Sequence, residues 1–220
     1  MISPASVQLF SGLSENEIRA IEAVAIRRRF EASQIIVTAN EPAKSLFLVA
    51  TGCVDYYVTN EAGHDILLRR LAAGDVFGVG SMLSRPIGYI GTAKAVQHIQ
   101  VLEWRDRVVR QLVKTYPQLT ENALRTVLRY LALYAKRHMA LVSNTAQERL
   151  ACVLSSLGSR TGHAVATGVE IGIKNEDLAS LADVSFFTAS RVLKDWDRHG
   201  VVAKSRGKVI IRSPEKLLAA

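Results

Sequence analysis

The sequence contains only two cysteines among 220 residues, Cys53 and Cys152, and they stand far apart. This scarcity excludes a disulfide framework, and it excludes a zinc or iron–sulfur site that takes four thiolates from one chain. Cys152 falls in an apolar stretch of helical character, residues 148–154, where we expect a buried structural thiol rather than a redox sensor.

Long hydrophobic runs are also missing. No run approaches the roughly 20 apolar residues that a helix needs to span a bilayer. Residues 1–6 contain no basic segment followed by an apolar stretch. The sequence therefore predicts no signal peptide, a cytoplasmic location and no membrane partner.

Signatures of catalysis and of metal binding are equally scarce. The sequence has no nucleophile elbow, Walker loop or zinc motif. Its five histidines are scattered, without the His-x-His pair that a cupin-type metal enzyme uses. We therefore expect neither an enzyme nor a resident metal ion or cofactor.

Positive charge is what the sequence has in excess, with a formal net charge of +8 at pH 7. Basic residues crowd into residues 191–212, and a second cluster occupies residues 105–114. This distribution favours a polyanionic partner, although a basic surface that is merely solvated gives the same composition.

Short β-rich runs fill residues 30–104, and the clearest lie at residues 35–37, 46–49, 54–58 and 66–68. Gly52, Gly63 and Gly74 recur between them at intervals of eleven residues. Strands spaced by glycine turns predict an antiparallel barrel or sandwich, with a hairpin tip at residues 60–63. A short helix capped by Ser14 and Glu17 is predicted before them.

One long helix is predicted to begin in the turn that contains Pro117 and to end near Val142. Apolar residues recur along it at alternating steps of four and three, and a second stripe runs beside them through Val127, Tyr134 and Leu141. Together the stripes form an arc wider than one β-domain can cover. We therefore predict a homodimer seam at Leu124, Leu128, Leu131 and His138, with a helix buried inside a monomer as the alternative.

The segment after this helix has a different pattern. Residues 143–146 interrupt the apolar periodicity and predict a hinge or a helix cap. A helix is expected over residues 147–157, followed by a polar, glycine-rich turn at residues 158–162.

Residues 174–194 predict two short helices joined by a tight turn. Asn175 is expected to cap the first helix and Ser185 the second, while Asp183 tolerates the left-handed conformation that the turn requires. The small side chains of Ala179 and Ala182 allow the helices to cross closely. This pattern is typical of a DNA-binding helix-turn-helix.

The second of these helices would present its outer side to DNA. Arg191 suits bidentate contact with guanine, and Thr188 or Ser190 suits a phosphate or a base. For the adjacent Phe186 and Phe187, inward packing of one ring and contact with thymine methyl groups are both open. The predicted DNA contacts are Lys174, Asn175, Ser185, Phe186, Phe187, Thr188, Ser190, Arg191, Lys194, Arg206 and Lys208.

A basic hairpin is predicted after the helix-turn-helix. His199 and Gly200 end the second helix, and residues 201–204 and 208–212 then flank a turn at residues 205–207. Arg206 and Lys208 in such a wing would hold phosphates.

Three segments, residues 9–14, 71–78 and 185–194, resemble the CRP/FNR family of bacterial transcription regulators, and the order of elements is similar over nearly the whole chain. The resemblance implies an α+β fold: an antiparallel β-roll like a cyclic-nucleotide-binding domain over residues 1–110, a long dimerisation helix and hinge over 111–143, and a winged helix-turn-helix over 144–220. It implies a homodimer on roughly palindromic double-stranded DNA, with RNA polymerase as the protein partner.

The departures from the family concern the effector. Members that bind cyclic nucleotides carry a glutamate after the glycine that matches Gly78, and an arginine some ten residues later. This sequence has Val79 and Tyr89 there, and neither replaces a charge-assisted contact with phosphate. Cyclic AMP is therefore not the expected effector. The pocket of another effector would be lined by Gly78, Val79, Tyr89, Ile90 and Tyr134.

Other sensing chemistries of the family have few candidate residues here. Two scattered cysteines cannot supply the iron–sulfur branch. His98 and His138 are the candidate haem ligands, although a lone histidine is more often structural. Two mechanisms stay open, an unknown small ligand in the β-roll and DNA binding without any effector.

The recognition helix departs from the family as well. Many members have arginine and glutamate after the capping serine, where this chain has Phe186 and Phe187. Arg191 is retained and carries over as a base contact, whereas the family's consensus site does not. The alternative function is that of a regulator that binds a cyclic nucleotide or another small ligand and acts on a protein partner. This alternative does not explain the winged helix.

Overall fold

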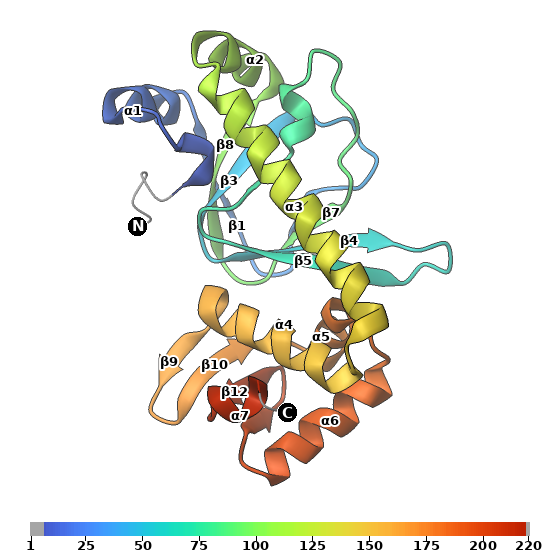
Figure 1. Cartoon of the computed structure of the whole chain (residues 1–220). Coiled ribbons are helices and arrows are strands. Elements are labelled where there is room, and N and C mark those ends of the chain that lie inside the picture. Colours follow the sequence, from blue (N-terminus) through green and yellow to red (C-terminus); the bar gives the residue numbers. More distant parts are fainter. Residues whose placement is uncertain (1–6, 219–220) are drawn as a thin grey trace. The chain divides into compact units, whose positions relative to one another are not determined.

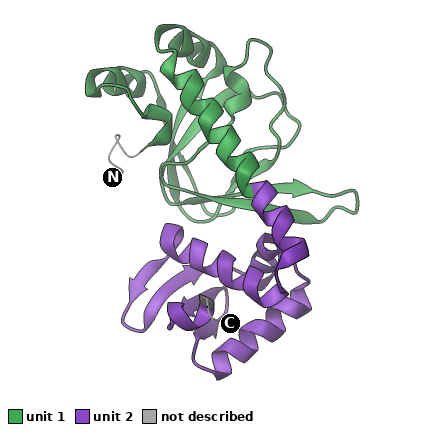
Figure 2. Cartoon of the chain, viewed as in Figure 1, with its two compact units in different colours: residues 1–133 green, residues 134–220 purple. Residues whose placement is uncertain are grey.

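The computed structural model describes residues 7–218 (Figure 1). The chain forms two compact units, residues 1–133 and 134–220, which divide inside the long helix (Figure 2). The domain boundaries expected at residues 110 and 143 stay predictions. Residues 1–6 lie outside the described residues. The prediction that the chain has no signal peptide rests on this segment. None of the helices in the described part combines the length and hydrophobicity of a membrane span.

The first unit contains two four-stranded sheets in which every paired strand is antiparallel. One sheet has the order β1-β8-β3-β6 and the other β2-β7-β4-β5. The strands are β1 (Ile26–Phe30), β2 (Ile35–Val37), β3 (Ser45–Thr51), β4 (Cys53–Thr59), β5 (Asp65–Ala72), β6 (Val76–Phe77), β7 (Thr92–Ala95) and β8 (Ile99–Arg105). The predicted α+β fold with an antiparallel β-roll is confirmed.

Strand β3 shows how two cores are built on one sheet. Leu46 and Leu48 point to a cluster shared with α1 (Glu15–Ala23) and α2 (Asp106–Thr115). Phe47 and Val49 point the other way, into the apolar space between the two sheets. Successive side chains of a strand alternate between its faces, so a strand covered on both sides is apolar throughout.

Two local predictions for this unit are confirmed. Ser14 caps α1, and Glu17 completes a capping box. The backbone N–H and hydroxyl of Ser14 donate to the Glu17 carboxylate, which lowers the pKa of that carboxyl. Asn60 and Gly63 lie in the tight turn between β4 and β5, as expected for a hairpin tip.

Helix α3 (Gln118–Ser143) follows Pro117 and runs for 26 residues. Only its first part is buried, at Leu119, Asn122, Ala123 and Thr126. The Asn122 side chain donates to the carbonyls of Leu9 and Ser11, at 2.9 and 2.7 Å, and so fixes the start of the helix to the N-terminal segment. Apolar residues farther along are exposed, and the most exposed include Leu131 at 62 % and Val142 at 88 %.

The second unit consists of helices and one sheet with the strand order β11-β12-β10-β9. Its elements beyond α3 are α4 (Ala146–Thr161), β9 (His163–Val165), β10 (Gly168–Gly172), α5 (Asn175–Ala182), α6 (Phe186–Arg198), β11 (Val202–Ser205), β12 (Lys208–Ile211) and α7 (Pro214–Leu218). The expected break at residues 143–146 is confirmed as a cap, because Thr145 and Glu148 form a capping box on α4.

Two expectations for α4 are wrong. The predicted turn at residues 158–162 begins inside the helix, which continues to Thr161. Gly158 serves close packing instead, since a Cβ there would lie 3.2 Å from Ile211 Cδ1. Cys152 is exposed rather than buried, because α4 turns Leu150, Ala151 and Leu154 to the core.

Candidate nucleic-acid interface

The helix-turn-helix is formed by α5, a tight turn and α6. Asp183 ends α5 with φ of 51°, the left-handed conformation expected of it. The Ser185 hydroxyl accepts a hydrogen bond from the Thr188 backbone N–H at 3.1 Å, which confirms Ser185 as the cap of α6. The left-handed turn residue and the helix cap each involve only a few neighbouring residues, so the local sequence is enough to predict them.

The capping role expected for Asn175 is wrong. Lys174 occupies the cap position of α5 and makes no side-chain capping bond, and Asn175 is the first helical residue. The Asn175 amide donates instead to the Ser190 hydroxyl at 3.0 Å, which links α5 to α6. Ser190 is half-buried and therefore has a structural role in addition to any DNA contact.

Helix α6 has one buried side and one basic, exposed side. Ala189, Val192, Leu193 and Trp196 are buried, as the helical periodicity predicts. Phe187, Arg191, Lys194 and Arg198 are exposed, and their spacing of four, three and four residues places them along one face. This face is the part of the unit that could enter a DNA groove.

The two phenylalanines lie at the start of this helix. Phe187 is 81 % exposed and Phe186 is 42 % exposed, so inward packing is wrong for Phe187. Their rings meet edge to face, with 5.8 Å between the centroids. Thr188 is close by, but its hydroxyl pairs with that of Ser185 at 2.8 Å and so helps to hold the first turn.

The wing consists of β11, β12 and the turn between them, as the sequence predicts. Arg206 is exposed in that turn. The Lys208 ammonium contacts the Glu170 carboxylate of β10 at 2.7 Å. A phosphate contact by Lys208 therefore competes with an existing ion pair, whereas Arg206 is placed for such a contact directly.

Two arginines contact the turn between α5 and α6. Neither of them is among the residues predicted from the sequence. Arg149 of α4 donates to the carbonyls of Asn144, Ala182 and Asp183 at 2.7, 3.0 and 3.3 Å. Arg137, near the end of α3, donates to the Ser180 carbonyl at 3.2 Å and contacts the Asp183 carboxylate at 3.0 Å. The last carbonyls of a helix have no partner within it, so these cations satisfy the end of α5.

The expected effector residues of the first unit have different surroundings. Gly78 has φ of 79°, and a Cβ there would lie 2.3 Å from the Ser45 carbonyl oxygen. Tyr89 lies beside it, and its hydroxyl both accepts from the Ser45 N–H and donates to the Ser45 carbonyl. Burial raises the pKa of Tyr89, which keeps this phenol protonated. Val79 packs against the α1–α2 cluster and Ile90 is 72 % exposed. Tyr134 lies on α3, in the second unit.

Two buried arginines of the β-roll each contact a carboxylate. Arg70 contacts Asp55 through two hydrogen bonds of 2.6 and 2.8 Å. Arg69 contacts Asp75 at 3.0 Å, and its guanidinium lies 3.8 Å from the ring centroid of Tyr130 on α3. Each arginine has a carboxylate partner, so this cluster is not a ready-made receptor for a phosphate.

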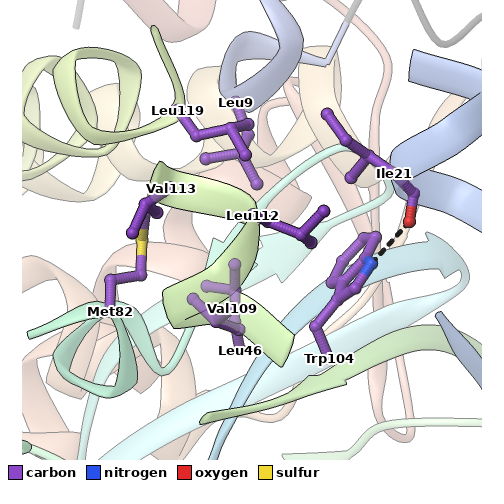
Figure 3. Close-up of a pocket in the computed structure, with 9 residues that line it drawn as sticks. All are labelled: Leu9, Ile21, Leu46, Met82, Trp104, Val109, Leu112, Val113 and Leu119. Atoms are coloured by element: carbon purple, nitrogen blue, oxygen red, sulfur yellow. Dashed lines mark hydrogen bonds between the residues drawn. The ribbon is translucent and has the colours of Figure 1, made fainter. Parts of the chain in front are cut away.

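The cavity shown in Figure 3 lies on the other side of the β1-β8-β3-β6 sheet, beneath α2. Its lining is apolar and includes Leu46, Val109 and Trp104, whose indole N–H donates to the Ile21 carbonyl at 2.8 Å. The cavity measures about 10 Å³, whereas small-molecule sites enclose about 300–1,000 Å³. It is a packing gap rather than an effector site.

Neither of the candidate haem ligands is buried. His98 is exposed and approaches Glu31 at 3.9 Å, and His138 is exposed on α3. Within residues 7–218, no group of three or more histidine, cysteine or acidic side chains could hold a metal ion.

Two family models match the chain. A cyclic nucleotide-binding domain matches residues 27–116, and a Crp-like helix-turn-helix domain matches residues 148–220. The first match covers most of the β-roll, and the second covers the helix-turn-helix and the wing.

Whole proteins are similar over nearly the full chain. The Cyclic AMP receptor protein of Thermus thermophilus is 29% identical, over 93% of this chain and 92% of that protein. Electron transport regulator A of Shewanella oneidensis is 24% identical, over 90% of this chain and 80% of that protein. The c-di-GMP-responsive global regulator CLP of Xanthomonas campestris has a similar structure, with a TM-score of 0.77, 18% identity and coverage of 90% of this chain and 99% of that chain.

Replacing Arg149 with alanine should lower the free energy of unfolding by about 2 kcal/mol, because three backbone carbonyls lose a charged donor. Chemical denaturation measures this loss. Arg191→Ala is the matched control, since this exposed arginine is expected to leave stability unchanged. Equal stability of both variants would contradict the role of Arg149 at the end of α5.

Proposed function

The chain belongs to the CRP/FNR family of transcription regulators, and from this premise we propose that it acts as a homodimer whose α6 helices read a palindromic DNA site. The observation that carries this proposal is the exposed basic face of α6, on a helix-turn-helix that is capped and clamped at its turn. Members of this family are regulators of transcription rather than enzymes.

Base reading is assigned to Arg191. Its side chain is exposed in the middle of α6, and a guanidinium can donate two hydrogen bonds to guanine O6 and N7. Ser185, Thr188 and Ser190 lie close to this face, although their hydroxyl groups already hold the helix ends together. Lys174 and Asn175, at the start of α5, complete the expected contact surface.

Phosphate contacts are assigned to Lys194 and to the wing. Lys194 lies on the same face of α6 as Arg191, and Arg206 is exposed at the turn of the hairpin. Contacts of this kind fix the register of the protein on the duplex and contribute most of its salt dependence. Lys208 would join them by giving up its contact with Glu170.

Dimerisation is assigned to α3. Leu124, Leu128 and Leu131 are 57 %, 53 % and 62 % exposed, and His138 continues the same line. A seam of this spacing on a helix is covered well by an identical helix related by a two-fold axis. Two symmetric recognition helices would explain a palindromic site.

Cyclic AMP does not fit the residues of the β-roll. Val79 packs into an apolar cluster and Tyr89 is bonded to Ser45, so neither offers a cation or a carboxylate to the nucleotide. We propose that DNA binding is independent of cyclic AMP, with another ligand or none as the signal. The regulator would work in the cytoplasm, where its DNA target and its proposed partner RNA polymerase are found.

Arg191→Ala should weaken DNA binding by about 1–3 kcal/mol per half-site and relax one base position in each half-site. Selection of bound sequences from random DNA, with the wild type and the variant in parallel, measures both effects. Lys194→Ala is the control, since a phosphate contact should lower affinity for all sequences and reduce the salt slope by about one per protomer. An affinity that is insensitive to salt would contradict DNA binding through these side chains.

Leu131→Glu should convert the dimer into a monomer, because it places a charge in the centre of an apolar seam. Sedimentation equilibrium measures the change in mass, and DNA affinity should fall with it. Leu83→Glu, at a residue that is 49 % exposed and lies outside α3, is the matched control and should stay dimeric. A dimer that survives Leu131→Glu would place the seam elsewhere.

Saturating cyclic AMP should leave the melting temperature unchanged. A ligand at about one hundred times its Kd would stabilise the folded protein by about 2.7 kcal/mol, which a thermal shift detects readily. The Cyclic AMP receptor protein of Thermus thermophilus serves as the positive control. A clear rise in the melting temperature of this protein would overturn independence from cyclic AMP.

A further inference from the structure

The ring of Phe187 is unusual for its exposure. It is 81 % exposed, while Ala189, Val192 and Leu193 of the same helix are buried. A single exposed apolar residue is common, but Phe187 forms a contiguous exposed apolar group with Phe186, and such groups can mark a contact surface.

Phe187 lies on the basic face of α6. It precedes Arg191 by four residues and Lys194 by seven, so the three side chains follow one line along the helix. Phe186 lies beside this line, is half as exposed, and meets the Phe187 ring at an interplanar angle of 77°. Phe186 therefore supports the ring, and Phe187 projects farthest.

The backbone beneath the ring is held firmly. The Ser185 hydroxyl accepts from the Thr188 N–H, and its contact with the Thr188 hydroxyl adds a second link across the first turn. The N-terminal part of a recognition helix is the part that meets base edges in the major groove. The Phe187 ring is thus attached to a backbone that is already ordered, which lowers the entropy cost of placing it against a base.

The chemistry of a phenyl ring selects one partner. Phe187 has no donor or acceptor, so it cannot bond to the polar edges of guanine, cytosine or adenine, and covering those edges would cost their hydrogen bonds to water. The 5-methyl group of thymine is the apolar group that the major groove presents. We propose that Phe187 selects thymine in each half-site by contact with this methyl group. The inference rests on the proposed function, because it requires α6 to lie in the major groove.

The geometry also gives a register. Four residues of helix rise about 6 Å, and successive base pairs are about 3.4 Å apart. Side chains this close on one helix reach neighbouring base pairs, so the selected thymine should lie within about three base pairs of the guanine that Arg191 reads. This spacing is a consequence of the face shared by the two side chains.

The experiment replaces thymine by uracil in the selected DNA site, one position at a time and symmetrically in both half-sites. This change removes the methyl group and keeps every hydrogen-bonding group of the base pair. Wild-type affinity should fall about fourfold per half-site at one position only, the factor that corresponds to one buried methyl group. Phe187→Ala should bind the thymine and uracil sites equally.

Two further variants serve as controls. Phe187→Leu keeps an apolar side chain and should retain part of the preference for thymine. Val165→Ala changes an exposed apolar residue of the same unit, on β9, and should retain all of it. Melting temperatures of all variants should match the wild type, since Phe187 contributes little to the core.

The outcomes separate the inference from the proposed function. Salt-dependent, sequence-specific binding with no uracil-sensitive position overturns the role of Phe187 alone, and so does equal uracil sensitivity of the wild type and Phe187→Ala. A selected site without a conserved thymine near the guanine has the same effect. Absence of sequence-specific binding overturns the proposed function, and the inference falls with it.

Discussion

The exposed apolar stripe of α3 is the constraint on which the proposed architecture depends. The helix is 26 residues long, yet Leu119, Asn122, Ala123 and Thr126 are its only buried residues in the described part of the chain. Burial of apolar surface yields about 25 cal/mol per Å², so a row of leucines open to water is a strong drive to association. In the proposed dimer an identical helix covers this stripe, and the two-fold axis between the helices would set the symmetry of the DNA site.

Electrostatic contacts then hold the reading surface in place. The end of α5 would leave carbonyl groups without partners, and Arg137 and Arg149 supply donors to them from α3 and α4. The same residues fix Asp183, the left-handed residue between α5 and α6. The N-terminus of α6 is thus positioned by the Ser185 cap and by the clamped turn that precedes it. Such rigidity favours discrimination between bases, because little ordering remains to be done on binding.

The β-roll keeps the architecture of a sensor with altered chemistry. Arg70 contacts Asp55 and Arg69 contacts Asp75, and the guanidinium of Arg69 also stacks on the ring of Tyr130 in α3. The contact between Arg69 and Tyr130 connects the roll to the middle of α3. The relatives are named for different signals, cyclic AMP for one and c-di-GMP for another, so membership of the family leaves the signal open.

The sequence by itself determined the features that act over short distances: the β-roll, the helix-turn-helix, the caps at Ser14 and Ser185, and the turn at Asp183. Each feature depends on the conformational preference of one residue or on a periodic pattern of apolar residues. Both kinds of signal can be recognised in a short stretch of sequence. Tertiary structure alone decided the partner of Asn175, the anchoring of Tyr89 on Ser45, the clamp by Arg149 and the outward face of Cys152. The reason is physical: these side chains find partners or neighbours that lie far away in sequence, so their roles follow from packing and not from local pattern.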